Sequence, residues 1–168
     1  MVTIPNMITI GRICLVPVFV VVFYLPTEHR MQAAAAIFII AALTDYLDGY
    51  VARRLKQETK AGAILDPLAD KLIILTALVM MTGKGVPYIV TAIILFRELL
   101  ITGIRALREA EPMVKARFLG KLKMASQIIA VTMALLALPH SLFMLWIATA
   151  LTVISGADYV LSVLNPNR

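Results

Sequence analysis

The sequence predicts an all-α integral membrane protein with six transmembrane helices, and two observations support this fold class. The first is composition: of 168 residues, 61% are hydrophobic and only 15% are charged, with a mean hydropathy of +0.90. Soluble domains are close to half apolar and a quarter charged. The second is that apolar runs long enough to cross a bilayer recur along the chain between turn signals. We expect a single domain over residues 1–168.

Six such runs give the expected helices. In chain order, their predicted ranges are 7–26, 31–56, 64–83, 86–110, 119–138 and 141–164. Basic residues gather at two links between helices. The link after the second helix carries Arg53, Arg54, Lys56 and Lys60, and the link after the fourth helix is surrounded by Arg105, Arg108, Lys115, Arg117, Lys121 and Lys123. By the positive-inside rule these links and both termini are cytoplasmic. A compact chain of this kind suits a bacterial inner membrane.

The first helix begins with a polar face. Asn6, Thr9 and Arg12 are three residues apart and share one side of a helix. They could approach a nucleotide or metal site. An interfacial helix start, with Arg12 anchored at the lipid headgroups, explains them equally well.

Acidic residues concentrate in the second and third helices. Spacings of 0, 3, 4, 7 and 8 place five residues of the second helix on one stripe: Asp45, Asp48, Gly49, Ala52 and Arg53. In the third helix Asp66 and Asp70 are one turn apart. Pro67 suits a first helical turn with Asp66 as its N-cap, which leaves open whether Gly62 shares their stripe. Because the two helices run in opposite directions, we expect the four aspartates to meet in the cytoplasmic half, in a polar cavity.

Four facing carboxylates repel one another unless a cation lies between them. Oxygen ligands without His or Cys select Mg²⁺, Mn²⁺ or Ca²⁺ rather than zinc. Arg53 and the small residues Gly49, Ala52 and Gly62 would let a phosphate group approach closely, and a spare aspartate could act as a general base. A purely structural pairing of the aspartates with Arg53, Arg54 and Lys71 would leave the glycine and alanine spacing unexplained.

The last three helices add bases and few acids. Arg97 and Arg105 share a stripe of the fourth helix, with Glu98 beside Arg97, and Lys121 and Lys123 stand at the start of the fifth. Positive-inside topology alone would explain several of these bases, but Arg97 lies deep within its helix. The net charge of +6 needs no nucleic acid as a partner, because anionic lipids and anionic substrates account for it.

Eight residues of the second and third helices resemble the signature of the CDP-alcohol phosphatidyltransferase family: Asp45-x-x-Asp48-Gly49-x-x-Ala52-Arg53, then eight residues, then Gly62-x-x-x-Asp66-x-x-x-Asp70. The resemblance implies a six-helix enzyme, usually a homodimer, with two divalent metal ions, Mg²⁺ or Mn²⁺, at the aspartates. It implies that the first three aspartates are the main ligands and that Asp70 acts near the acceptor as the base. It also implies that the glycines, Ala52 and Arg53 contact the CDP group of CDP-diacylglycerol, whose β-phosphorus an alcohol attacks, releasing CMP. From their place on the first helix, Asn6 and Thr9 are further candidates for binding the CDP-lipid.

Three further stretches bear on the acceptor alcohol. IPNMITIGR, FRELLITGIRALREAE and LGKLKMASQ resemble the branch of the family that makes phosphatidylglycerol phosphate. A fixed cluster of bases suggests that the acceptor itself carries a phosphate, and glycerol 3-phosphate would fit. The residues expected to bind that phosphate are Arg97, Arg105, Lys121 and Lys123.

Two alternatives remain open at this stage. A sister enzyme would use serine, inositol phosphate or phosphatidylglycerol as acceptor. A divalent-cation channel or transporter would line its pathway with the aspartates, but the outer halves of the second and third helices, FIIAAL and LIILTALVMM, are nearly free of polar groups.

Overall fold

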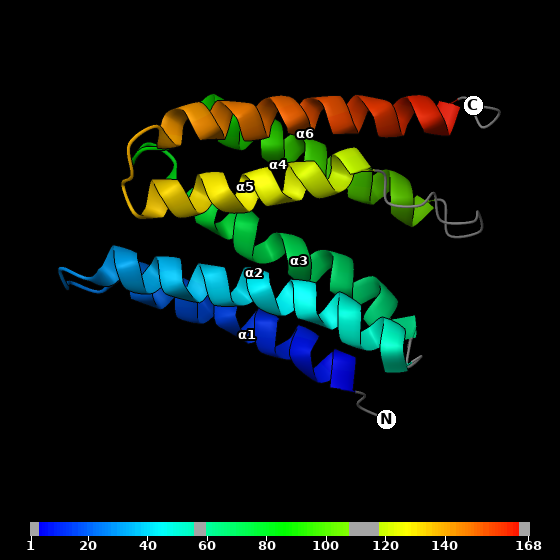
Figure 1. Ribbon diagram of the computed structural model, residues 1–168, viewed down its shortest axis with the longest axis horizontal. Helices are drawn as coiled ribbons and strands as arrows, with labels where there is room; N and C mark the ends of the chain where they lie inside the picture. Colours follow the sequence, from blue (N-terminus) through cyan, green and yellow to red (C-terminus); the bar gives the residue numbers. More distant parts are fainter. Residues whose placement is uncertain (1–3, 56–59, 108–117, 165–168) are drawn as a thin grey trace. The chain divides into compact units, whose positions relative to one another are not determined.

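The computed structural model describes the backbone of residues 4–55, 60–107 and 118–164, and the side chains of residues 10–44, 71–104 and 118–164. Six helices make up this part of the chain (Figure 1): α1 (Ile4–Tyr24), α2 (Arg30–Leu55), α3 (Lys60–Met81), α4 (Tyr88–Leu107), α5 (Phe118–Leu135) and α6 (Ser141–Leu164). The predicted all-helical class and the predicted number of helices are therefore confirmed over the described residues.

Helix boundaries differ from prediction mainly at α3. The prediction began this helix at residue 64, with Asp66 as a possible N-cap, whereas the helix begins at Lys60. Asp66 therefore lies inside the helix, and the prediction of an N-cap there is wrong. The helix continues through Pro67, just as α1 continues through Pro17. Membrane helices tolerate proline because neighbouring groups satisfy the backbone atoms that it leaves unbonded.

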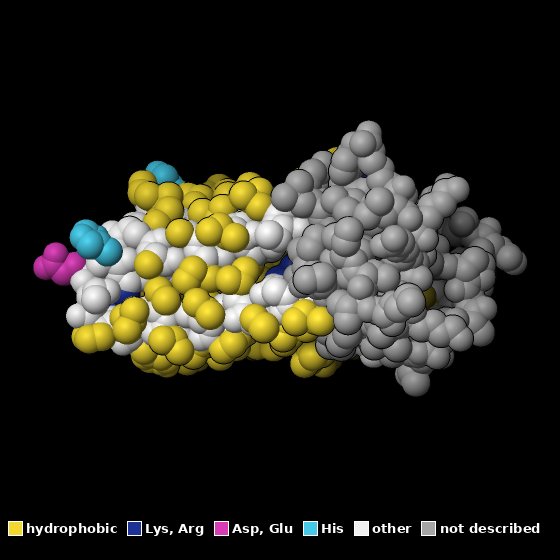
Figure 2. Space-filling view, turned by 90° about the horizontal axis from the view of Figure 1, so that it is seen from below, with side chains coloured by type: hydrophobic (Ala, Val, Ile, Leu, Met, Phe, Trp, Pro, Cys, Tyr) yellow, Lys and Arg dark blue, Asp and Glu magenta, His cyan; other side chains and the backbone are white. Residues whose placement is uncertain are grey.

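The surface and the helix compositions are those of a membrane protein. Within the described side chains, two helices are long and apolar enough to cross a bilayer, Phe118–Leu135 and Ser141–Leu164. Shorter apolar segments occupy Ile10–Tyr24, Arg30–Thr44 and Lys71–Met81. Large apolar side chains such as Phe96, Phe143 and Leu161 are exposed, and Figure 2 shows hydrophobic side chains over much of the described surface. Lipid tails would cover such a surface at no cost.

The chain divides into two compact units, residues 1–80 and 81–168. In the first unit α1 packs against α2, and Phe19, Phe23 and Phe38 are buried. Ala34 and Ala35 of α2 are also buried, and such small residues let helices approach closely. Figure 1 shows α3 returning from the end at which α2 finishes.

In the second unit α6 packs against both α5 and α4. α4 and α6 run in the same direction, with α5 antiparallel to them (Figure 1). A tight turn precedes α4, in which the backbone N–H of Gly83 donates to the carbonyl of Val86, 2.9 Å away. Gly83 has a φ of 75°, a backbone conformation that favours glycine. Ala137 and His140, both with positive φ, form the turn between α5 and α6.

Candidate functional site

The backbone supports the spacing argument for the aspartate stretch. α2 is helical to Leu55, so its stripe of Asp45, Asp48, Gly49, Ala52 and Arg53 follows one face of a regular helix. Because α3 begins at Lys60, Gly62, Asp66 and Asp70 are successive i, i+4 neighbours on a continuous helix. This answers the question that Pro67 had left open. The side chains of all eight residues lie outside the described ones.

A divalent cation fits the chemistry of this donor set. The candidate ligands are all carboxylate oxygens, placed one turn apart on two consecutive helices joined by the short link 56–59. Hard cations such as Mg²⁺ and Mn²⁺ prefer such ligands. Among the side chains that the structure describes, no three His, Cys, Asp or Glu residues gather in a group that could hold a metal. The four aspartates are not among those side chains.

Other predicted site residues of the first unit are placed only by their backbone. Asn6 and Thr9 belong to the first turns of α1, and their side chains lie outside the described ones. Arg12, one turn further along, is described and is only 3% exposed. This burial contradicts one of the two roles predicted for Arg12, in which its side chain reaches out to the lipid headgroups.

A buried ionic cluster in the second unit contains two of the predicted acceptor-binding residues. Glu98 of α4 is 3% exposed, and its Oε1 atom accepts hydrogen bonds from Lys123 Nζ of α5 at 2.5 Å and from Arg97 Nη1 at 3.0 Å. Lys123 is itself buried. One carboxylate therefore links two cations from two helices. Charged groups at this depth are expensive and commonly mark a functional site.

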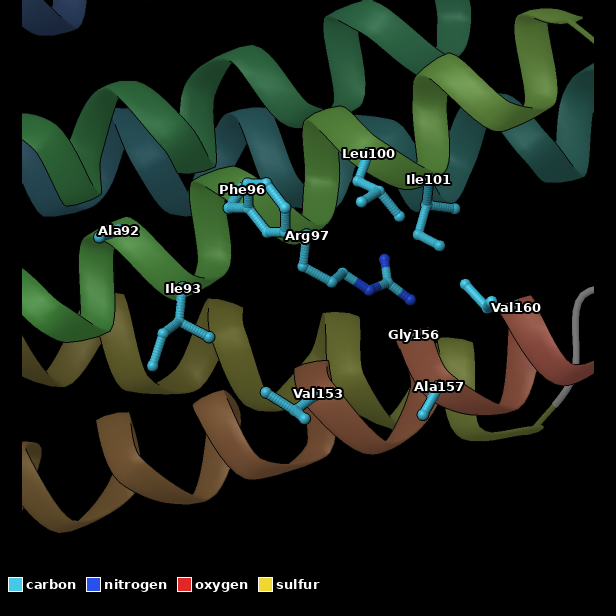
Figure 3. Close-up of a pocket in the computed structure, with 10 residues that line it drawn as sticks. All are labelled: Ala92, Ile93, Phe96, Arg97, Leu100, Ile101, Val153, Gly156, Ala157 and Val160. Carbon is cyan, nitrogen blue, oxygen red and sulfur yellow. The ribbon is translucent and has the colours of Figure 1, made fainter.

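Arg97 also binds α6. Its Nε donates to the carbonyl oxygen of Thr152 at 3.2 Å, and its Nη2 donates to the hydroxyl of Ser155 at 3.0 Å. The side chain crosses α6 at Gly156, where an added Cβ would lie 3.1 Å from both Cγ and Nε of Arg97. Figure 3 shows Arg97 reaching from α4 toward α6 beside this glycine. Gly156 thus makes room for the arginine.

A second group of hydrogen bonds, next to the ionic cluster, joins α5 to α6. Gln127 of α5 donates from Nε2 to Thr152 Oγ1 at 2.8 Å, and the Thr152 hydroxyl donates to the carbonyl of Ala148 at 2.6 Å. Both side chains are buried. Thr152 therefore contacts Arg97 through its carbonyl oxygen and Gln127 through its hydroxyl, and it connects all three helices of the unit.

An apolar groove of about 470 Å³ lies between α4 and α6, with Arg97 as its single charged residue (Figure 3). Phe96 and Leu100 line it from α4, and Val153 and Val160 line it from α6. The other lining residues are apolar side chains and Gly156. Its walls can therefore contact hydrocarbon, while Arg97 supplies the only polar contact.

The four predicted acceptor-binding residues thus have different surroundings. Arg97 and Lys123 meet at one carboxylate, Lys121 is exposed at the first turn of α5, and the Arg105 side chain lies outside the described ones. The partners of Arg97 on α6, namely Thr152, Ser155 and Gly156, were not predicted from the sequence. Their spacing was the available signal, because small and polar residues three or four apart mark a helix face that packs closely in membranes.

Comparison with known proteins gives one family and several close relatives. Residues 2–154 match the family model described as CDP-alcohol phosphatidyltransferase. A protein of Bacillus subtilis is 38% identical over 95% of this chain and 94% of its own length, and one of Pseudomonas fluorescens is 37% identical over 96% and 86%. One of Escherichia coli is 41% identical over 76% and 73%. All three bear the name CDP-diacylglycerol–glycerol-3-phosphate 3-phosphatidyltransferase.

Proposed function

The chain belongs to the CDP-alcohol phosphatidyltransferase family, and we propose that it transfers the phosphatidyl group of CDP-diacylglycerol to glycerol 3-phosphate, giving phosphatidylglycerol phosphate and CMP. The observation that carries this proposal is the 37–38% identity, over nearly the whole chain, to two relatives named for that reaction. The complete aspartate signature and the buried bases of the second unit support it.

In the proposed reaction a hydroxyl oxygen of glycerol 3-phosphate bonds to the β-phosphorus of the CDP-lipid. The bond between that phosphorus and the bridging oxygen of the pyrophosphate breaks, and the electron pair leaves with CMP. Asp70 accepts the proton of the attacking hydroxyl. Positioning and charge neutralisation account for most catalysis of phosphoryl transfer, so the residues that hold the two substrates matter as much as the base.

Asp45, Asp48 and Asp66, with Asp70, would hold divalent metal, Mg²⁺ or Mn²⁺, in two sites. When bound, such a metal neutralises charge on the pyrophosphate and on the departing phosphate. Arg53 contributes a fixed cation to the same pyrophosphate. Gly49, Ala52 and Gly62 leave space for the CDP group, and Asn6 and Thr9 contribute polar contacts to it.

Arg97, Arg105, Lys121 and Lys123 would bind the phosphate of the acceptor. The cluster at Glu98 supports this role, since it brings an arginine and a lysine of different helices together. An acceptor without a phosphate, such as serine, would offer no anion to these cations and should therefore bind more weakly than glycerol 3-phosphate.

Release of CMP tests the proposal directly. Purified protein in detergent is incubated with CDP-diacylglycerol and Mg²⁺ or Mn²⁺, with and without glycerol 3-phosphate. We expect release only when both metal and glycerol 3-phosphate are present. Parallel reactions with serine, inositol phosphate or phosphatidylglycerol serve as controls for the acceptor. Release with one of these instead of glycerol 3-phosphate would contradict the assigned acceptor and leave the family intact.

We further propose that all six helices cross a bacterial inner membrane, that both termini and the site face the cytoplasm, and that the enzyme is a homodimer. The basic residues of the links at 53–60 and 105–123 support the orientation. Light scattering of the purified protein, corrected for bound detergent, measures the oligomeric state. A mass of one chain, 18.4 kDa, would contradict the dimer.

A further inference from the structure

Glu98 holds two cations that would otherwise repel each other. Lys123 Nζ and Arg97 Nη1 both donate to the same oxygen atom, Glu98 Oε1, at 2.5 and 3.0 Å. The two nitrogen atoms can therefore be no farther apart than the sum of these distances. That separation lets the oxygens of a single phosphate group contact both. Like charges this close are stable in a buried place only when a carboxylate lies between them.

The orientation of Arg97 is fixed while part of its hydrogen-bonding capacity stays available. A guanidinium has five N–H donors. Three of them are used in the described structure, by the Thr152 carbonyl, by Glu98 and by the Ser155 hydroxyl. One N–H on each of Nη1 and Nη2 remains for a ligand. Such a pair on neighbouring nitrogens matches the oxygens of a phosphate.

We propose that Glu98 is the positioning residue for the acceptor phosphate, because it holds the Lys123 ammonium and the Arg97 guanidinium together as one preformed anion-binding pair. The inference rests on the proposed function, in which these two residues receive the phosphate of glycerol 3-phosphate. Glu98 acts through the two cations and contacts no substrate. Ordering two long, flexible side chains before the substrate arrives removes an entropic cost from binding.

Loss of the Glu98 charge would act in two opposing ways. Removal of a negative charge raises the positive potential felt by an incoming phosphate. It also removes the carboxylate that the two cations share, so Lys123 moves away from Arg97, which α6 still holds, and the preformed pair is lost. The second effect dominates, because breaking a buried ion pair costs far more than a long-range attraction returns. We therefore expect weaker binding of the acceptor.

The test is steady-state kinetics of the full-length enzyme in detergent, with each substrate varied in turn. Glu98→Gln keeps the side-chain shape and removes the charge, and we expect the KM for glycerol 3-phosphate to rise about tenfold or more. The KM for CDP-diacylglycerol should stay close to that of the wild type. Glu98→Asp keeps the charge on a shorter side chain and should give a smaller rise. Glu28→Gln, the same change at an exposed turn, is the matched control.

A double-mutant cycle separates positioning from a general structural role. If Glu98 acts through Lys123, Glu98→Gln should add little to the acceptor KM once Lys123 is replaced by Met. Strictly additive effects would overturn the inference. So would an unchanged or lower acceptor KM, or equal loss for both substrates. If Glu98→Gln cannot be isolated in folded form, Glu98→Asp decides: a raised acceptor KM supports the inference, and an unchanged one overturns it.

Failure of the inference can be told apart from failure of the proposed function. If the wild-type enzyme releases no CMP with glycerol 3-phosphate, the proposed function fails before any variant is compared. If the wild type is active and the Glu98 variants keep its acceptor KM, the function stands and only the role of Glu98 is refuted.

Discussion

The absence of a side chain at Gly156 leaves room for the Arg97 side chain to cross α6. An arginine that crosses a neighbouring helix at this distance needs a position without a side chain, and an added Cβ would lie 3.1 Å from its Cγ and Nε. The arginine reaches the Ser155 hydroxyl and the Thr152 carbonyl because its stem passes over the glycine. Gly156 thus controls the direction of a side chain that is proposed to bind the acceptor.

Gly156→Ala should therefore weaken acceptor binding. Alanine forces the Arg97 stem off its present course, at a cost of about 0.5–1.5 kcal/mol for a strained side-chain torsion. We expect the KM for glycerol 3-phosphate to rise about twofold to tenfold. Gly103→Ala is the matched control, because a Cβ there meets nothing within 4 Å and the acceptor KM should not change. Equal KM values in the two variants would contradict this account of Gly156.

The assignment of Asp70 as the general base allows the most direct test of the proposed mechanism. Asp70→Asn removes the proton acceptor with little change in size, so kcat should fall about a hundredfold to ten-thousandfold. Binding of the CDP-lipid, measured by equilibrium dialysis with radiolabelled CDP-diacylglycerol in detergent micelles, should be largely retained. Asp158→Asn removes an aspartate charge from α6, outside the aspartate signature, and should keep most of the turnover. An active Asp70→Asn enzyme would refute the assignment of Asp70 as the base.

At the scale of the elements, sequence periodicity predicted all six helices over the described residues, and the range 141–164 was predicted without error for α6. The start of α3 was not predictable from local signals. A proline preceded by an aspartate normally marks a helix start, yet the helix begins at Lys60 and includes both. Membrane helices tolerate proline in their interior, so this local signal does not determine the helix start; α1 likewise continues through Pro17.

Sequence spacing predicted one part of the candidate site and missed another. The difference is whether the residues lie on one helix or on several packed helices. The aspartate stripes follow from positions within single helices, which sequence spacing determines directly. The contacts of Arg97 with Thr152 and Ser155 join residues 55 and 58 positions apart, and only the packing of α4 against α6 brings them together. Glu98 is adjacent to Arg97 in the sequence, but its bond to Lys123 likewise depends on how α5 packs beside α4.

Thr152→Val tests how much this packing depends on one hydroxyl. The change keeps the side-chain shape and leaves Gln127 Nε2 without its acceptor at 2.8 Å. We expect the free energy of unfolding to fall by about 0.5–1.5 kcal/mol, the typical net contribution of one hydrogen bond. Fluorescence of Trp146, the single tryptophan, reports on α6 during denaturation in detergent.

Thr132→Val on α5 provides the comparison for Thr152→Val. The Thr132 side chain makes no hydrogen bond within the part of the chain that the structure describes, so its loss should change stability little. If both variants were equally stable, the Gln127–Thr152 bond would contribute nothing measurable to the packing of α5 against α6.

For the whole molecule, we predict that activity requires a divalent metal. Asp45, Asp48, Asp66 and Asp70 lie on two consecutive helices, and four carboxylates that face one another are most readily kept charged by a cation between them. A chelator should therefore abolish CMP release, and added Mg²⁺ or Mn²⁺ should restore it. Zn²⁺ should restore less, since no His or Cys accompanies the carboxylates. Full activity after exhaustive chelation would contradict a metal-dependent site.

The orientation of the whole chain can be tested through its single cysteine. Cys14 is exposed, and Cys14→Ser gives a background without thiols. New cysteines are then placed one at a time at His29 and His140, in turns proposed to face outward, and at Gln57 and Lys115, in links proposed to face the cytoplasm. Every variant must first retain CMP release, which shows that it is folded.

A thiol reagent that cannot cross the inner membrane should label the cysteines at positions 29 and 140 in intact cells with a permeable outer envelope. Those at positions 57 and 115 should react only after the inner membrane is opened. This result is expected because the links at 53–60 and 105–123, which we propose to be cytoplasmic, carry the excess of Lys and Arg, and these residues cross a membrane at great cost. Labelling of positions 57 and 115 from outside, with positions 29 and 140 protected, would reverse the proposed orientation and contradict a cytoplasmic site. Labelling of positions 29 and 57 from the same side would instead show that α2 does not cross the bilayer. That result would contradict the proposal of six membrane-spanning helices.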